Sequence, residues 1–309
     1  MAMIPFDDRD GALWMDGRMI PWRDAQVHVL THGLHYASAV FEGERVYGGH
    51  IFECEAHSRR LRRSAEILGF EIPYSAAEID QAKRQVVAAH GLDDGYVRPV
   101  AWRGSEMMGV AARATRIHLA IAAWVWPSYF PPEARARGIR MTMAPWRRPS
   151  PECAPVESKA AGLYMICTMS KHAAEEQGCD DALMLDYRGF LAEATGANLF
   201  LAIDGRLHTP KPDCFLDGLT RQTVIRLARE RQIEVVERHI GPAELATASE
   251  VFLTGSAAEL TPVGQIDDLT FTPGRMSQLL YADYMALVRR QPSLVPTKGP
   301  VPAREPALA

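Results

Sequence analysis

Apolar and polar positions follow two different periods in the first half of the chain, and both strands and helices are therefore predicted there. Two short apolar runs within residues 12–20 flank an Asp-Gly pair, which is typical of a hairpin turn. Residues 55–69 and 75–90 repeat apolar side chains at helical spacing, and a glycine marks the end of each segment. Residues 96–103 and 117–126 are predicted to be buried strands.

The second half of the chain continues this mixture of strands and helices. Two strand pairs are expected, the second joined by another Asp-Gly turn. An apolar face on residues 220–231 predicts a helix, and a further helix is expected to start near Lys159. The predicted strands of this half are 139–143, 182–186, 190–193, 198–203, 206–209 and 250–253.

Prolines suggest how the chain is divided. Pro127, Pro131 and Pro132 lie between the two halves, and such a stretch is typical of a linker. A second proline-rich stretch follows Gln291 and is expected to pack little. We therefore expect a first domain at 1–126, a linker at 127–137, a second domain at 138–290 and a tail at 291–309.

The composition is that of an ordinary globular protein. The chain has 309 residues, of which 47% are hydrophobic and 23% charged, and it is long enough for two medium domains. A net charge of −4 gives no electrostatic reason to expect nucleic acid or an anionic membrane as a partner. The longest apolar run, residues 117–126, is far shorter than a membrane span, so no membrane partner is expected.

Cysteines and histidines give no sign of a bound metal. The ten histidines form no HExxH pattern and the five cysteines form no CxxC pair, so we expect neither a metal site nor a disulfide framework. Scattered cysteines suit a reducing compartment, and the acidic start of the chain lacks the features of a signal peptide. A cytoplasmic protein is expected.

Lys159 and Glu193 are candidates for chemistry. Lys159 is followed by Ala-Ala-Gly, and small neighbours allow an apolar pocket in which loss of water favours the neutral, nucleophilic amine. Glu193 ends a predicted strand, where a carboxylate can keep a pyridine nitrogen protonated. Taken alone, each residue has a simpler interpretation, because most lysines and glutamates are exposed to solvent.

Two glycine turns are candidates for an anion site. Gly218 and Thr220 precede a predicted helix, and Gly255 with Ser256 follows a predicted strand. Free backbone N–H groups at such positions bind phosphate, and Arg60 can add a forked contact. Each signal also fits an ordinary helix cap or a solvated basic helix face.

Taken in order, these residues resemble the branched-chain aminotransferases, which are fold-type IV enzymes that depend on pyridoxal 5'-phosphate (PLP). The resemblance runs from about Trp14 to about Pro262, most of the chain. It is carried by His32-Gly-Leu-His-Tyr36, Val40-Phe-Glu-Gly43, His57-x-x-Arg60-Leu-x-x-Ser64, Tyr96-Val-Arg98-Pro, Lys159-x-x-Gly162-x-Tyr164, Glu193-x-x-Gly196-x-Asn198, Gly218-Leu-Thr220-Arg and Thr254-Gly-Ser256-Ala-Ala-Glu259.

The resemblance implies a fold of the α/β (α+β) class, with a smaller N-terminal α/β domain, a larger C-terminal pseudo-barrel domain and the cofactor between them. Lys159 is implied to be the Schiff-base lysine and the catalytic proton carrier. Such enzymes are at least homodimers, because first-domain residues of one subunit complete the pocket of its neighbour. The implied cofactor contacts are Glu193 to the pyridine nitrogen, Tyr164 to the ring hydroxyl, and Arg60, Leu219, Thr220 and Ser256 to the phosphate.

The resemblance further implies transamination of branched-chain or other apolar L-amino acids with 2-oxoglutarate. Aromatic pocket walls favour apolar side chains, although core packing explains such residues as well. An arginine between apolar strand residues needs a charged partner, and a ligand carboxylate can supply one. The implied substrate contacts are Tyr36, Phe41, Trp126 and Tyr129 in the wall, Arg98 with Tyr36 for the distal carboxylate, and Tyr96 with the amides near Ala257 and Ala258 for the α-carboxylate.

Other functions on the same fold stay open. A D-amino-acid aminotransferase tends to follow its lysine with Ser or His and Leu-Asn, unlike Ala160-Ala161-Gly162 here. An (R)-selective amine transaminase can keep every cofactor residue, and Tyr96-Val97-Arg98 is the feature that separates it from the branched-chain enzymes. A non-enzymatic binding protein on this fold would need neither Lys159 nor Glu193.

Overall fold

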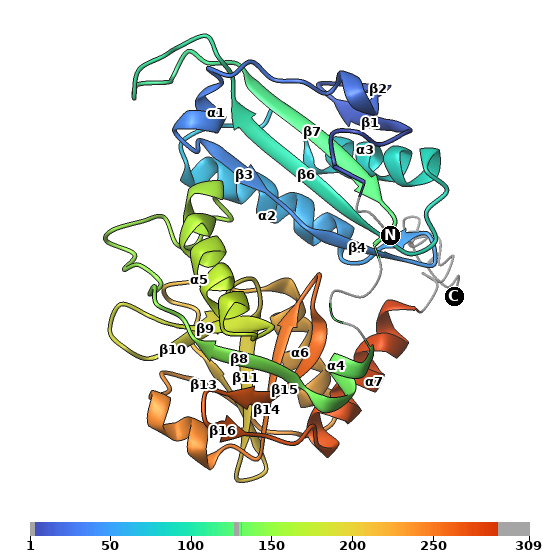
Figure 1. Cartoon of the computed structure of the whole chain (residues 1–309). Coiled ribbons are helices and arrows are strands. Elements are labelled where there is room, and N and C mark those ends of the chain that lie inside the picture. Colours follow the sequence, from blue (N-terminus) through green and yellow to red (C-terminus); the bar gives the residue numbers. More distant parts are fainter. Residues whose placement is uncertain (1–3, 127–129, 131, 290–309) are drawn as a thin grey trace, which may run out of the picture.

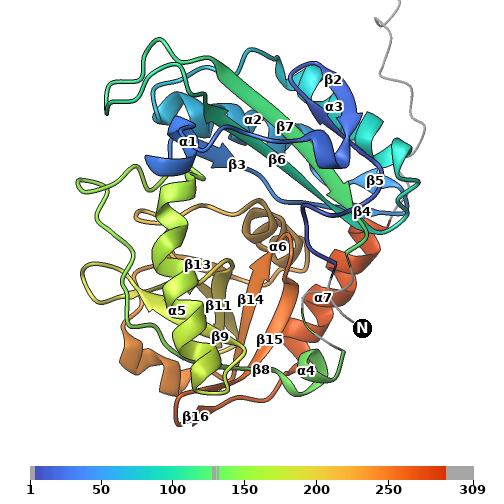
Figure 2. The same cartoon turned by 45° about the horizontal axis from the view of Figure 1, so that its top comes forward.

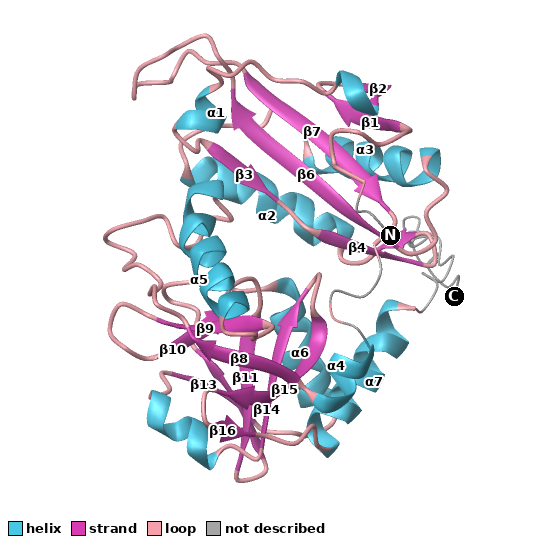
Figure 3. Cartoon of the chain, in the orientation of Figure 1, coloured by secondary structure: helices cyan, strands magenta, loops and turns pink. Residues whose placement is uncertain are grey.

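The computed structural model describes residues 4–126, 130 and 132–289, and its strands form two sheets (Figure 1). The first sheet is built from the N-terminal half of the sequence and the second from the C-terminal half. Figure 3 shows helices beside both sheets, so each half is a mixed α and β structure. Within the described ranges, no helix is long and apolar enough to cross a membrane.

The first sheet has the strand order β2-β1-β7-β6-β4-β5, with β3 paired to β6. Helices α2 and α3 pack on one face of it and share one apolar core with β6 and β7. Tyr96 and Arg98 alternate with core residues along β6 and therefore lie on the opposite face. The elements are β1 (Ala12–Met15), β2 (Arg18–Pro21), α1 (His32–His35), β3 (Ala39–Phe41), β4 (Glu44–Tyr47), β5 (His50–Ile51), α2 (Cys54–Ile67), α3 (Ala76–Ala89), β6 (Gly95–Arg103) and β7 (Ile117–Trp124).

Local chemistry sets the turns and helix ends of this half. Asp16 and Gly17 both have positive φ, at 48° and 96°, as a tight turn between β1 and β2 requires. The side chain of Ser75 accepts a hydrogen bond from the backbone of Glu78, whose carboxylate accepts one from the backbone of Ser75. This capping box starts α3. The hairpin, the two helices and the two long strands predicted for this half are confirmed.

The second sheet closes on itself. Its strand order is β10-β9-β8-β15-β14-β11-β12-β13, with β16 paired to β15. A further pairing of β10 with β11 joins β10, β9, β8, β15, β14 and β11 into a ring, which is the expected pseudo-barrel. Buried apolar side chains such as Leu183, Leu199 and Val263 fill one core here. The strands are β8 (Ile139–Met143), β9 (Asp181–Leu185), β10 (Leu191–Ala194), β11 (Asn198–Ile203), β12 (Arg206–Pro210), β13 (Val235–Arg238), β14 (Glu250–Gly255), β15 (Glu259–Ile266) and β16 (Leu269–Thr270).

Three long helices lie around the ring (Figure 2). They are α5 (Met165–Glu176), α6 (Leu219–Glu230) and α7 (Arg275–Val288). α6 and α7 pack against β11 and β14 through a separate apolar core that includes Val224, Leu280 and Phe252. α5 stands at the side of the ring next to β9.

Two segments differ from the sequence expectation. The helix expected near Lys159 begins as a 3-10 helix at Ala161–Tyr164, and Lys159 itself lies before it. Part of the expected linker forms a short helix, α4 (Pro132–Arg137). This helix packs on the second sheet, because Ala134 is buried and Arg135 donates to the Glu259 carboxylate at 2.7 Å. Residues 127–129, 131 and 290–309, which include the expected tail, lie outside the described residues.

The segment that carries Lys159 joins the two halves of the chain. The backbone N–H of Lys159 donates to the Ser64 hydroxyl on α2 at 3.0 Å, and its carbonyl accepts from the N–H of Phe41 on β3 at 3.2 Å. A second contact lies further along, where the Tyr47 hydroxyl on β4 donates to Glu259 on β15 at 2.9 Å. Lys159 is therefore fixed at the junction of the two sheets.

Candidate active site

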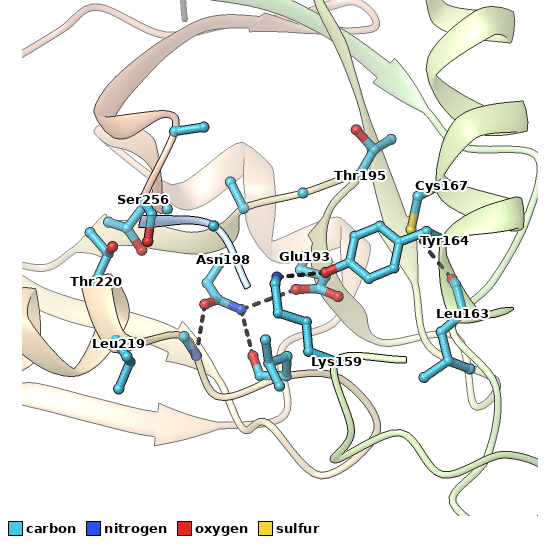
Figure 4. A pocket seen from close by; sticks show the side chains of 18 of the residues that line it. Lys159, Leu163, Tyr164, Cys167, Glu193, Thr195, Asn198, Leu219, Thr220 and Ser256 are labelled. Carbon is cyan, nitrogen blue, oxygen red and sulfur yellow. Dashed lines mark hydrogen bonds between the residues drawn. The ribbon is translucent and has the colours of Figure 1, made fainter. Parts of the chain in front are cut away.

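A cavity lies at this junction, and the side chain of Lys159 projects into it (Figure 4). Its walls come from the segment before α5, from β10 and β11, from the start of α6, from the turn after β14, and from α2 and β6 of the first half. The residues expected to contact the cofactor all line it with Lys159: Arg60, Tyr164, Glu193, Leu219, Thr220 and Ser256. Folding thus brings together side chains that are nearly 200 positions apart in the sequence.

The amine of Lys159 is held by an aromatic pair. It donates a hydrogen bond to the phenol oxygen of Tyr164, 2.8 Å away. The same amine lies 5.0 Å from the ring centroid of Phe41, and the Tyr164 ring packs edge-on against Phe41 at 4.7 Å. An amine oriented in this way can serve as a nucleophile and as a carrier of protons.

Glu193 is a buried carboxyl group at the base of the cavity. Burial raises its pKa to about 7, although the nearby cations of Arg148 and Lys159 oppose that rise. Nε of Arg148 lies 3.4 Å from one carboxylate oxygen, and the Asn198 amide donates to the other at 3.1 Å. Because burial destabilises the ionised form of this carboxyl group, a further cationic N–H group beside it would be a stabilising partner.

Asn198 links this carboxyl group to the start of α6. Its side-chain nitrogen also donates to the Leu216 carbonyl at 3.1 Å, and its oxygen accepts from the backbone N–H of Gly218 at 3.2 Å. Gly218 leaves room for this contact, because a Cβ there would lie 2.2 Å from the Asn198 oxygen. The first turn of α6 is therefore pinned to β11.

The other end of the cavity gathers hydrogen-bond donors. Figure 4 shows Thr220, in the first turn of α6, beside Ser256 in the turn after β14. Nη1 of Arg60 and the Thr254 hydroxyl are buried and have no partner among the described residues. Buried donors are costly to leave unpaired, and a helix start attracts negative charge, so this end suits an anion such as a phosphate.

The first sheet contributes a third wall. Tyr96 lines the cavity, whereas Phe41 and Arg98 lie just outside its lining, with the Arg98 guanidinium 4.7 Å from the ring centroid of Phe41. The half-buried Arg98 reaches the Tyr96 hydroxyl at 3.4 Å, and its Nε has no partner among the described residues. Arg98 is thus a cation that contacts the same aromatic ring as Lys159.

The remaining residues expected to bind the substrate are not all in the cavity wall. Ala257 lines the cavity, whereas Ala258 packs into the ring core. Trp126 packs against Tyr96, with ring centroids 5.4 Å apart. Tyr36 is 45% exposed and stacks on His32. Tyr129 lies outside the described residues, and the substrate roles of all these residues stay predictions.

Three contacts of the site could not be predicted from the sequence: those of Arg148 and Asn198 with Glu193, and that of Glu42 with Arg60. Arg148 lies in a proline-containing loop that gives no hint of its contact with Glu193. Asn198 and Glu42 do lie within the motifs named above, but their partners become visible only in the structure.

Comparison with known proteins agrees with this arrangement. Residues 39–266 match the family described as Amino-transferase class IV. The chain is 40% identical over 288 residues to the branched-chain-amino-acid aminotransferase of Pseudomonas aeruginosa, covering 91% of this chain and 94% of that protein. The crystal structure of the branched-chain amino acid aminotransferase of Escherichia coli is similar with a TM-score of 0.89 at 34% identity, covering 93% of this chain and 98% of that one. The PLP form of the branched-chain amino acid aminotransferase from Thermobaculum terrenum gives a TM-score of 0.83 at 31% identity, covering 91% and 94%.

Proposed function

The chain belongs to the class IV aminotransferases, PLP-dependent enzymes of fold type IV, and from this premise we propose that it transfers the amino group of branched-chain or similarly apolar L-amino acids to 2-oxoglutarate. Transamination follows from the family, and the choice of substrates is the proposal. It depends most on one observation, that Arg98 lies without a carboxylate partner among the described residues, against the ring that also contacts Lys159.

The cavity fits PLP at both ends. Nη1 of Arg60, the Thr254 hydroxyl and the start of α6 supply donors for the phosphate. Glu193 supplies a carboxylate for the ring nitrogen, and Tyr164 a hydroxyl for the ring oxygen. When bound, PLP supplies an electron sink for the electron pair left at the substrate Cα.

The side chains of the enzyme orient the reactants and move the proton. The amine of Lys159 takes the proton from the substrate Cα and, with PLP in place, would deliver that same proton to C4′ of the cofactor. Tyr164 keeps that amine in place, because its oxygen accepts the 2.8 Å hydrogen bond. Glu193, fixed by Asn198 and Arg148, keeps negative charge beside the ring nitrogen.

The two substrates place opposite demands on one pocket. The rings of Phe41 and Tyr96 both contact Arg98, and burying a branched aliphatic side chain against these rings would be worth roughly 1.5–3 kcal/mol. Arg98 offers a charged partner for the distal carboxylate of 2-oxoglutarate. Another branched-chain amino acid aminotransferase of similar structure is described in complexes with N-(5'-phosphopyridoxyl)-L-glutamate and with 4-methylvaleric acid. We assign the α-carboxylate to Tyr96 and the turn at Ala257.

We also propose that a second copy of the chain completes the site. Val29 and Leu34 are exposed, as are Met108 and Val110 in a neighbouring loop. The two segments lie together, because His32 contacts the carbonyl of Gly109 at 3.2 Å. A patch of this kind on one protein surface is typical of an interface, and sedimentation of the purified enzyme as a monomer would contradict the dimer.

The division into domains at 1–126 and 138–290 and a cytoplasmic location are further proposals. The division is supported by the two sheets, which each use one half of the chain. The location is supported by the five cysteines, all of which are free thiols.

The substrate proposal is tested by a panel of amino donors with 2-oxoglutarate as acceptor. Leucine, isoleucine and valine are expected to give the highest kcat/KM, followed by phenylalanine. D-alanine and (R)-1-phenylethylamine are expected to react poorly. If either of these two is the best donor, the alternative enzyme on the same fold is the correct assignment, and turnover of none of the donors would favour a binding protein.

A further inference from the structure

Glu42 and Arg60 form a buried pair at the edge of the cavity. Nε of Arg60 donates to one carboxylate oxygen of Glu42 at 2.6 Å, and Nη2 donates to the other at 2.8 Å. This two-point contact fixes both the position and the plane of the guanidinium. It uses one edge of the group, and the nitrogen that remains, Nη1, is buried without a partner among the described residues.

Glu42 is itself held by further contacts. It lies between β3 and β4, is 0% exposed, and its backbone N–H donates to the Pro99 carbonyl at 2.9 Å. Nδ1 of His57 lies 2.7 Å from the carboxylate oxygen that also contacts Nη2 of Arg60. His57 and Arg60 are three residues apart on α2, so both side chains meet Glu42 from one face of that helix.

The charges in this cluster balance. Burial raises the pKa of Glu42, but Arg60 and His57 outweigh burial and hold that pKa well below its usual range, so the carboxylate is ionised. Burial lowers the pKa of His57 to about 4 against the opposing effect of Glu42, so the ring is neutral and donates its Nδ1–H. The guanidinium of Arg60 therefore lines the cavity with a fixed orientation, and its positive charge is already paired with Glu42.

We propose that Glu42 is a positioning residue for PLP: it fixes the guanidinium of Arg60 so that Nη1 faces the phosphate, and His57 holds Glu42 in place. The proposal rests on the assignment of Arg60 to the phosphate under the proposed function. Glu42 acts through Arg60 and not on the cofactor itself. Loss of Glu42 should therefore weaken recognition of the phosphate and leave recognition of the pyridine ring unchanged.

The test compares binding of PLP with binding of pyridoxal, which has the same ring and lacks the phosphate, to the full-length chain stripped of cofactor. The readout is the ratio of the two dissociation constants. Arg60→Ala is expected to lower the preference for PLP by about 30-fold, and Glu42→Gln by about tenfold, with pyridoxal affinity changed less than about twofold. In the Arg60→Ala background, Glu42→Gln is expected to cause no further loss, because the two residues act as one unit.

Each result separates one claim from another. An unchanged preference in Arg60→Ala would remove Arg60 from the phosphate site and overturn the assignment on which the positioning role rests, while the donor panel tests the choice of substrates independently. A loss in Arg60→Ala without a loss in Glu42→Gln would overturn the positioning role alone. Equal losses for PLP and pyridoxal in Glu42→Gln would show that Glu42 serves only the fold. Glu55→Gln, which breaks an exposed pair with Arg59 on the same helix, is the matched control and should leave the ratio unchanged.

A second pair of variants gives the same readout where Glu42→Gln does not fold. The amide of His57→Asn can replace the Nδ1–H donor, whereas His57→Leu cannot. His57→Asn is expected to retain the preference for PLP within about threefold, and His57→Leu to lose about as much as Glu42→Gln. Equal behaviour of the two variants would overturn the anchoring role of His57.

Discussion

The amine of Lys159 and the phenol oxygen of Tyr164 lie 2.8 Å apart, joined by a hydrogen bond that the lysine donates. The two residues are five positions apart in the sequence, and the 3-10 helix at Ala161–Tyr164 brings the phenol back over the amine. The reactive group of the site thus has its partner within its own segment.

Lys159→Ala is expected to lower kcat by at least about 10³-fold, because the variant lacks the group that moves the Cα proton. PLP should still bind, since the phosphate and ring-nitrogen contacts remain. Steady-state transamination assays and equilibrium dialysis measure the two effects separately. Lys211→Ala, which changes an exposed lysine outside the cavity, is the control, and wild-type turnover in Lys159→Ala would remove this lysine from the mechanism.

Glu193 gives a prediction about pH. Its pKa is about 7 in the folded chain without cofactor, against an ordinary value of 4.5. The folded state therefore binds the extra proton more tightly, so this group stabilises the fold most below pH 4.5 and loses that contribution as the pH rises to 7. The unfolding free energy of the apo wild type minus that of Glu193→Gln should fall by roughly 3 kcal/mol over this window.

Urea unfolding of the two apo proteins at pH 4.5, 5.5 and 7 tests this directly. Glu152→Gln, which alters an exposed carboxylate, should follow the wild type at every pH. A difference that does not change with pH would mean that Glu193 ionises as an ordinary surface acid.

Arg98→Ala should discriminate between the two acceptors. Loss of a charged partner for the distal carboxylate is expected to lower kcat/KM for 2-oxoglutarate by about 30-fold. The value for 2-oxoisocaproate, which carries no second carboxylate, should change by less than about threefold. Equal losses on both acceptors would show that Arg98 is structural.

Tyr47→Phe tests the contact between the two sheets. The substitution removes only the hydroxyl that donates to Glu259 at 2.9 Å, and this hydroxyl is buried. The unfolding free energy is expected to fall by about 1–2 kcal/mol, since Glu259 loses one of its buried partners. Tyr187→Phe, at a side chain that is 44% exposed, should lower the unfolding free energy by less than about 0.5 kcal/mol. An equal decrease in both variants would show that the contact between Tyr47 and Glu259 does not stabilise the fold.

Features set by neighbouring residues could be predicted from the sequence. The turn at Asp16 and Gly17 depends on bonds within a few positions and occurs as expected, and the helix expected over 75–90 begins with a cap formed by Ser75. Lys159 and Glu193 line one cavity, as their place in the ordered motifs of the resemblance implied, and their roles toward the cofactor stay predictions.

Features set by distant contacts could not be predicted in this way. Arg148 is 45 positions from Glu193, and Glu42 is 18 from Arg60, so no local period connects either pair. Within the expected linker, residues 132–137 form a short helix that begins at its proline, a position that favours this residue, and Ala134 is buried against the second sheet. The long-range pairs above depend on tertiary packing and not on local preference.

The seam that closes the ring is narrow, because β10 and β11 pair at the single position Glu193 with Asn198. The same two side chains form one wall of the cavity. Separation of β10 from β11 would therefore also separate two residues of the cavity. A molecule bound between Glu193 and α6 should stabilise this pairing. Amide hydrogen exchange around this seam should slow on addition of PLP more than exchange in β14 or β15, whose long pairing needs no such support.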